Sequence, residues 1–236
     1  MPASTARTAR LAGLLYVLSS IPGAYAWIYV GGRIVVKDDA AATAERIRAS
    51  EALFRAGIAG ELVGMTLFVF VALMLYRLFR PVAEGSALAM FVLILISIPI
   101  TLVGVVGEVA ALDFAGVAGR AHYLSAFDPR QRDALAYLGM TLHLDAIRVA
   151  QIFWGLWLFP FGVCVIRSRF IPRFLGALLV LAGIGNLAEP VAQLVLPQYA
   201  GALSVVGKLT LCELPIILWL LTVGARPRRE AVRAQA

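Results

Sequence analysis

Residues 86–112 read SALAMFVLILISIPITLVGVVGEVAAL, and this stretch decides the fold class. About twenty predominantly apolar residues are enough for an α-helix to cross the hydrocarbon core of a bilayer. Glu108 is the only charged residue in the stretch. The sequence therefore predicts a transmembrane helix that carries one carboxylate within the membrane.

Five other stretches have the same apolar character, so we expect an all-α, polytopic membrane helix bundle with six transmembrane helices. The chain is 61% hydrophobic and 15% charged, whereas soluble domains carry about 25% charged residues. One bundle would use nearly the whole chain, so residues 1–236 are interpreted as a single transmembrane domain. The predicted spans cover about 10–30, 52–79, 86–112, 137–166, 172–196 and 202–224.

Short interfacial helices are expected in the two long loops that connect these spans. In the first loop, Asp38 or Asp39 can cap a helix that begins with the sequence AAATAERIRAS. In the other loop, Asp128 followed by Pro129 is typical of a helix start, because a capping acid precedes proline at the first helical position.

The distribution of basic residues predicts the orientation of the chain in the membrane. With the N-terminus inside, the inner segments hold eleven Arg residues, and the outer segments hold seven Arg or Lys residues. Cytoplasmic loops carry the excess of basic residues, so both termini are predicted to be cytoplasmic.

The first span has two interpretations. Arg7 and Arg10, a short apolar core and the sequence Ala24-Tyr25-Ala26 are typical of a cleaved signal peptide. Tyr25, Trp27 and Tyr29 are instead typical of an interfacial aromatic belt at the end of a retained helix. We favour the retained helix.

The net charge of +7 does not indicate a nucleic-acid partner. The basic residues cluster at the ends of spans, where they meet anionic lipid, so the expected partner is the lipid bilayer. Cys164 and Cys212 lie within apolar runs and have no metal-binding spacing. The sequence identifies no cofactor and no oligomeric state.

Ionisable and amide side chains recur within the apolar spans, and these are the candidate site residues. Each charge at the centre of a membrane helix costs about 2.5–3.5 kcal/mol, so such groups must face one another or water. The predicted topology places most of them in the extracytoplasmic half, which predicts a polar intramembrane cavity there. The ligand-binding candidates are Glu51, Arg55, Glu61, Glu108, His143, Arg148, Asn186, Glu189 and Glu213.

Acids outnumber bases among these groups, so some carboxylates must be protonated, share a proton or bind a cation. The metal-ligand candidates are His143, Glu108, Glu189 and Glu213. One His among several carboxylates suits a divalent ion, but the HEXXH motif of zinc hydrolases is absent from the chain. Nucleophile motifs such as GxSxG are also absent, so no catalytic residue is identified.

Small residues on the second span predict a close helix contact. Ala56, Gly60 and Gly64 recur every fourth residue, on the side of the helix opposite the face that Glu51, Arg55 and Glu61 share. In membranes, this small-xxx-small spacing lets two helix backbones approach each other.

Three segments carry a resemblance to a known family. They are AAATAERIRASEALFRAGIAGEL (40–62), AHYLSAFDPRQRDALAYLGMTLH (121–143) and SRFIPRFLGALLVLAGIGNLAEP (168–190). In combination they resemble the membrane family catalogued as domain-of-unknown-function family 4386, and the similarity extends from ARLAGLLYVLS onward. The resemblance implies a bacterial integral membrane protein of about this size, and it implies no activity or substrate. We expect such a six-helix protein in the cytoplasmic (inner) membrane.

Three functions remain open at this point. The first is binding of a small polar ligand, a lipid headgroup or a cation in the polar cavity. The alternative is a metal-assisted intramembrane hydrolase acting on lipid, so whether the chain is an enzyme is left undecided. The third is a structural membrane protein in which the buried charges pair with one another.

Overall fold

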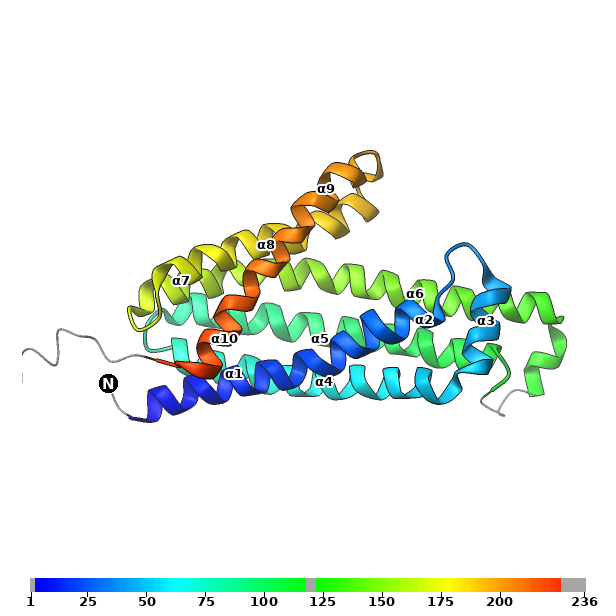
Figure 1. Cartoon of the computed structure of the whole chain (residues 1–236), viewed down its shortest axis with the longest axis horizontal. Coiled ribbons are helices and arrows are strands. Elements are labelled where there is room, and N and C mark those ends of the chain that lie inside the picture. The colour runs from blue at the N-terminus through cyan, green and yellow to red at the C-terminus, as the bar shows by residue number, and fades with distance from the viewer. Residues whose placement is uncertain (1–2, 118–121, 226–236) are drawn as a thin grey trace, which may run out of the picture. The chain divides into compact units, whose positions relative to one another are not determined.

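A computed structural model describes residues 3–117 and 122–225 of the chain (Figure 1). The predicted C-terminal cytoplasmic segment, 226–236, lies outside the described residues. Within them the fold is all-α and contains no strand. Six helices are long and apolar enough to cross a membrane, which confirms the six predicted spans. Their bounds are Thr5–Ile34, Glu51–Phe79, Glu84–Phe114, Pro129–Ser168, Arg173–Leu194 and Pro197–Thr222.

Several of these spans consist of more than one helical element. The N-terminal half of the chain contains α1 (Ala3–Ala24), the π-helical segment η1 (Tyr25–Val30), α2 (Gly31–Ile34), α3 (Ala40–Ala49), α4 (Glu51–Phe79) and α5 (Glu84–Phe114). The C-terminal half contains η2 (His122–Ala126), α6 (Pro129–Leu156), α7 (Leu158–Ser168), α8 (Arg173–Leu194), η3 (Pro197–Tyr199), α9 (Ala200–Gly207), η4 (Lys208–Glu213) and α10 (Leu214–Thr222). Segments η2, η3 and η4 are 3₁₀ helices.

The described chain divides into two compact units. The first unit comprises the described residues within 1–18, 67–98 and 148–236, and the second comprises those within 19–66 and 99–147. Helices α1, α4, α5 and α6 contribute residues to both units. The assignment of the whole chain to one transmembrane domain stays a prediction.

In the first unit, aromatic rings pack against one another around Trp157. The Trp157 ring stacks on Phe161 with a centroid distance of 5.2 Å and meets Phe68 edge to face at 6.0 Å. Phe79 lies 5.7 Å from Phe161 and 5.9 Å from Phe170. Such pairs contribute about 0.5–1.5 kcal/mol each beyond the area that they bury. This cluster packs α4 against the start of α7 in the first unit.

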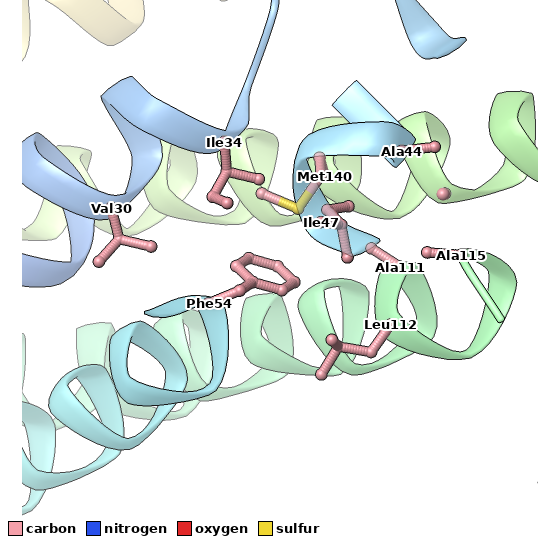
Figure 2. Close-up of a cluster of buried hydrophobic side chains, with 10 residues drawn as sticks. Val30, Ile34, Ala44, Ile47, Phe54, Ala111, Leu112, Ala115 and Met140 are labelled. Atoms are coloured by element: carbon pink, nitrogen blue, oxygen red, sulfur yellow. The ribbon is translucent and has the colours of Figure 1, made fainter. Parts of the chain in front are cut away.

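In the second unit, an apolar cluster joins α3 to the ends of the longer helices. Figure 2 shows that side chains from α2, α3, α4, α5 and α6 meet in it. Ile47 of α3 packs with Phe54 of α4 and Met140 of α6, and all three are at most 3% exposed. Helix α3 is therefore held against the bundle by burial of its apolar face.

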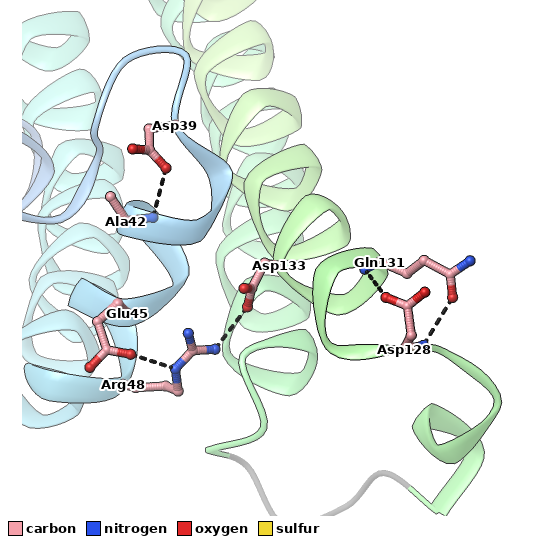
Figure 3. A network of polar contacts seen from close by, with 7 residues as sticks. All are labelled: Asp39, Ala42, Glu45, Arg48, Asp128, Gln131 and Asp133. Atoms are coloured by element: carbon pink, nitrogen blue, oxygen red, sulfur yellow. Dashed lines mark hydrogen bonds and ion pairs between the residues drawn. The ribbon is translucent and has the colours of Figure 1, made fainter.

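Polar contacts also hold α3 and the start of α6 (Figure 3). The Asp39 carboxylate accepts a 2.8 Å hydrogen bond from the backbone N–H of Ala42 and caps α3. Arg48 pairs with Asp133 of α6 at 2.9 Å. The Asp128 carboxylate accepts a 2.9 Å hydrogen bond from the backbone N–H of Gln131, at the start of α6. Both predicted helix starts are therefore confirmed.

The predicted small-residue contact is confirmed at two of its three positions. A Cβ atom added to Gly60 would lie 3.1 Å from the carbonyl oxygen of Pro22, and one added to Gly64 would lie 3.0 Å from that of Ser19. Ala56, however, is exposed, whereas Gly57 is buried and faces Val30. The ridge on α4 that receives the first span is therefore Gly57, Gly60 and Gly64.

Candidate functional site

Three of the candidate residues meet in the interior of the second unit. Glu61 comes from α4, Glu108 from α5 and His143 from α6, and their exposed fractions are 0%, 7% and 4%. Each residue offers a ligand atom, and these atoms all lie within 4.8 Å of one another. We call these three residues the buried cluster.

The distances in the buried cluster are too long for direct hydrogen bonds. His143 Nε2 lies 3.7 Å from Glu61 Oε2 and 3.8 Å from Glu108 Oε1. Hydrogen bonds between such groups measure about 2.7–3.2 Å. The imidazole and the two carboxylates therefore surround a common position without bonding to one another.

Two carboxylate oxygens of the cluster are buried without a hydrogen-bond partner among the described residues. They are Glu61 Oε1 and Glu108 Oε2. The second nitrogen of the His143 ring, Nδ1, is also buried without a hydrogen-bond partner among the described residues. A buried polar group without a partner costs about 1–3 kcal/mol, and more when it is charged. Such a site favours an occupant that supplies positive charge.

A close crossing of α5 and α6 brings Glu108 and His143 together. A Cβ atom added to Gly107 would lie 2.5 Å from the carbonyl oxygen of Gly139, and one added to Gly139 would lie 2.6 Å from that of Gly107. Only glycine fits at either position without moving the helices apart. The Gly107 contact extends to His143, whose backbone nitrogen would lie 3.1 Å from the added Cβ.

The apolar cluster of Figure 2 includes residues of the same three helices as the buried cluster, displaced along each helix toward α3. Phe54 precedes Glu61 on α4, Leu112 follows Glu108 on α5, and Met140 precedes His143 on α6. At 1.5 Å per residue these offsets correspond to about 4–11 Å along each helix. The carboxylates are therefore separated from the α3 end of the unit by closely packed hydrocarbon.

Trp27 also belongs to the site, although the sequence suggested an interfacial position for it. Its indole Nε1–H donates a 2.9 Å hydrogen bond to Glu61 Oε2. Trp27 lies in η1, the π-helical segment that begins three residues after Pro22. Single π-helical turns are rare in proteins, and those that do occur often lie at functional sites. One sequence feature pointed to this contact. The first span contains a tryptophan after Pro22, and the predicted span 52–79 contains a single Glu, Glu61.

The remaining candidates have contacts of their own. Glu51 and Arg55 pair at 2.7 Å on an exposed face of α4 in the second unit. In the first unit, Glu189 accepts hydrogen bonds from Gln151 at 3.3 Å and from Gln193 at 3.1 Å. The other candidates of the first unit also have partners: Asn186 donates to the carbonyl oxygen of Ala182, Glu213 accepts from the hydroxyl of Tyr16, and Arg148 has a polar or electrostatic contact.

The buried cluster offers two carboxylates and one imidazole to a single position. Neutral imidazole is a ligand for Zn²⁺, Cu²⁺, Fe²⁺ and Ni²⁺, and carboxylates bind Zn²⁺, Mn²⁺ and Mg²⁺. Two ligand atoms bound at about 2.1 Å to a tetrahedral ion stand about 3.4 Å apart. The observed 3.7 and 3.8 Å separations are close to that value. A divalent cation would also balance the charge of two carboxylates.

Comparisons with known proteins bear on the family and leave the activity open. Residues 11–224 match the family described as "Domain of unknown function (DUF4386)". An uncharacterized protein of Archaeoglobus fulgidus is 26% identical over 170 residues, which cover 72% of this chain and 84% of that protein. No solved structure matches the chain.

Proposed function

The chain belongs to the family of unknown function DUF4386, and we propose that this multi-pass membrane protein binds a divalent cation between Glu61, Glu108 and His143. The observation that carries the proposal is that one ligand atom from each of these buried residues lies within 4.8 Å of the others, and that the three side chains form no hydrogen bond with one another. The three ligands come from three different helices, so an ion there would join α4, α5 and α6.

The distances within the cluster favour a bound cation over direct hydrogen bonds between its three side chains. A protonated carboxyl group would donate its proton to a neighbouring acceptor at about 2.5–2.7 Å. The distances from His143 Nε2 to the two carboxylates, 3.7 and 3.8 Å, are about 1 Å longer than this. A gap of this size between three converging ligands suits an ion of the size of Zn²⁺ or Mn²⁺.

The direct test is the metal content of the purified protein. Chain stripped with a chelator in detergent is dialysed against Zn²⁺ or Mn²⁺, with Mg²⁺ in excess as competitor, and bound metal is measured by mass spectrometry. We expect one Zn²⁺ or Mn²⁺ per chain, bound with release of any protons that the ligands carry. Metal content no higher than in a Glu61→Gln, Glu108→Gln double variant would reject the proposal.

Trp27 is proposed to orient Glu61 for metal binding. Its hydrogen bond to Oε2 fixes the rotation of the carboxylate, whose Oε2 lies 3.7 Å from His143 Nε2. Outer partners of this kind contribute about 10–100-fold to metal affinity. We therefore expect Trp27→Phe to weaken Zn²⁺ binding by about that factor in equilibrium dialysis. The matched control is Trp219→Phe, because Trp219 donates to the carbonyl oxygen of Gly224 in the first unit; equal effects of the two changes would contradict this role.

The membrane and the orientation are proposed from the distribution of basic residues. We place the protein in the cytoplasmic (inner) membrane of a bacterium with both termini cytoplasmic. The buried cluster then lies in the extracytoplasmic half, because Glu61 is about 15 Å from the outer start of α4 at Glu51. Site-directed labelling of a cysteine introduced at exposed Glu45 in intact cells tests this orientation.

Metal-assisted hydrolysis within the membrane is the second candidate function. Catalytic zinc sites have three protein ligands and leave a coordination position open for water or substrate. The buried cluster offers three ligands, so lipid ester hydrolysis is the reaction to assay with the metal-loaded protein. If the protein binds Zn²⁺ but hydrolyses no lipid ester, cation binding is the function that remains.

A further inference from the structure

The last span is much less covered by the protein than the others. Only 17% of the apolar window in Pro197–Thr222 is buried, against 33–50% in the other five spans. Its exposed side chains include Val205, at 64%, and Leu211, at 65%. Contact with lipid explains why apolar side chains such as these are exposed. It does not explain an exposed charged side chain in the same span.

Lys208 lies near the middle of this span and is exposed. Its ammonium forms no hydrogen bond or ion pair with any residue that the structure describes. Lysines near the ends of membrane helices extend to the headgroups, but mid-span lysines face a partner or a water-filled cavity. A lipid headgroup lies at the membrane surface, so a protein carboxylate at the same depth fits Lys208 better.

Glu189 is a carboxylate at a similar depth in the same unit. A Cβ atom added to Gly185 of α8 would lie 2.5 Å from the backbone nitrogen of Thr210, which makes α8 and η4 immediate neighbours. Glu189 is one helical turn beyond Gly185, and Lys208 is displaced from Thr210 in the same direction, because the two segments are antiparallel. The positions of Glu189 and Lys208 along the helix axes therefore differ by about one helical turn or less.

Glu189 is exposed like Lys208 and has no ion pair among the described residues. Its two hydrogen-bond partners, Gln151 and Gln193, are neutral amides that leave its charge uncompensated. At this depth, α8 and η4 thus present an acid and a base that are both exposed and have no ion pair among the described residues. Because these charges are opposite, the surface of one copy is electrostatically complementary to the same surface of a second copy.

Small residues on α9 permit another helix to approach this surface. Gly201 and Gly207 have open space where a Cβ would stand, and Ser204 is exposed between them. Gly201, Ser204 and Lys208 follow the i, i+3, i+7 spacing of one helix face. Faces of small residues with a hydroxyl are typical of helix contacts in membranes.

We propose that this surface is a two-fold dimer interface, in which Lys208 of each copy pairs with Glu189 of the other. A two-fold interface repeats every contact, so one acid and one base per chain give two ion pairs. A second copy is the occupant we infer because the chain itself supplies both halves of the pair. Burial between two helices would also remove the mid-span charge from lipid.

The test uses two differently tagged copies that are expressed together and purified through one tag in mild detergent. Wild-type copies should co-purify. Lys208→Glu in both copies, or Glu189→Lys in both, should lower co-purification at least about tenfold, because each places like charges opposite each other. A Lys208→Glu copy expressed with a Glu189→Lys copy should restore it, because both ion pairs re-form between opposite chains.

The mixed pair distinguishes a dimer contact from an ion pair within one chain. If Lys208 and Glu189 paired within one chain, each single variant would keep its own like charges, and co-expression would not restore the contact. Arg80→Glu is the control, since Arg80 lies outside the spans and pairs at 3.1 Å with Glu84, the first residue of α5; it should leave co-purification unchanged. If a charge reversal prevents folding, Lys208→Met and Glu189→Gln are measured instead, and each should weaken co-purification. Monomeric wild-type protein, phospholipid retained on a monomer, or a mixed pair that stays apart would each overturn the proposal.

Discussion

Glu61→Gln and Glu108→Gln are each expected to weaken Zn²⁺ or Mn²⁺ binding at least about 100-fold, and His143→Ala is expected to do the same. Glutamine keeps the size of the side chain but loses the charge and one ligand oxygen. Loss of an outer partner alone costs about 10–100-fold, and a direct ligand should cost more. The readout is equilibrium dialysis of each purified variant against the metal ion.

Thermal unfolding gives an independent measure of the same change. An ion that binds the folded chain at 100 times its dissociation constant stabilises it by about 2.7 kcal/mol. We expect the metal ion to raise the unfolding midpoint of the wild type and of Glu51→Gln, a change at the exposed start of α4. Glu61→Gln should lose this response, and a full response in that variant would exclude Glu61 as a ligand.

Gly107→Ala is expected to destabilise the protein by about 1–3 kcal/mol or more, the usual cost of overpacking a close contact. The added methyl group would lie 2.5 Å from the carbonyl oxygen of Gly139 and 3.1 Å from the backbone nitrogen of His143. Helices α5 and α6 must therefore separate to accept it. For a chain of this size, each 1 kcal/mol corresponds to a midpoint change of about 2–4 °C in thermal unfolding.

Gly85→Ala is the matched control, because Gly85 lies in α5 with nothing within 4 Å of an added Cβ. Alanine is the better helix former by about 1 kcal/mol, so this change should be neutral or stabilising. Gly107→Ala should also weaken metal binding, since it displaces His143 from Glu108. If the two alanine variants unfold alike and bind metal alike, the close crossing does not position the site.

The buried cluster was only partly predictable from the sequence. Glu61, Glu108 and His143 were identified because ionisable groups are costly inside apolar spans. Glu189 and Glu213 satisfied the same criterion, yet they belong to the first unit and have hydrogen bonds to Gln151 and Tyr16 there. Depth along a helix can be counted from the sequence, but the rotation of each helix and its choice of neighbour depend on packing.

Trp27 illustrates a second limit. The sequence placed it with Tyr25 and Tyr29 in an aromatic belt, because aromatic residues at a span end are typical of the interface. In the structure, Tyr25 and Tyr29 are exposed, whereas the indole of Trp27 bonds to Glu61. The π-helical backbone of η1 changes the angular spacing of its side chains, and a count at 3.6 residues per turn does not include this change.

The sequence by itself determined six membrane-spanning helices, since twenty apolar residues must satisfy their backbone hydrogen bonds internally wherever lipid surrounds them. It also determined that the charges inside those helices need partners. Only the tertiary structure decided which charges meet. The glycine contacts between α5 and α6, and between α4 and the first span, set the helix separations that bring Glu61, Glu108 and His143 within 4.8 Å of one another.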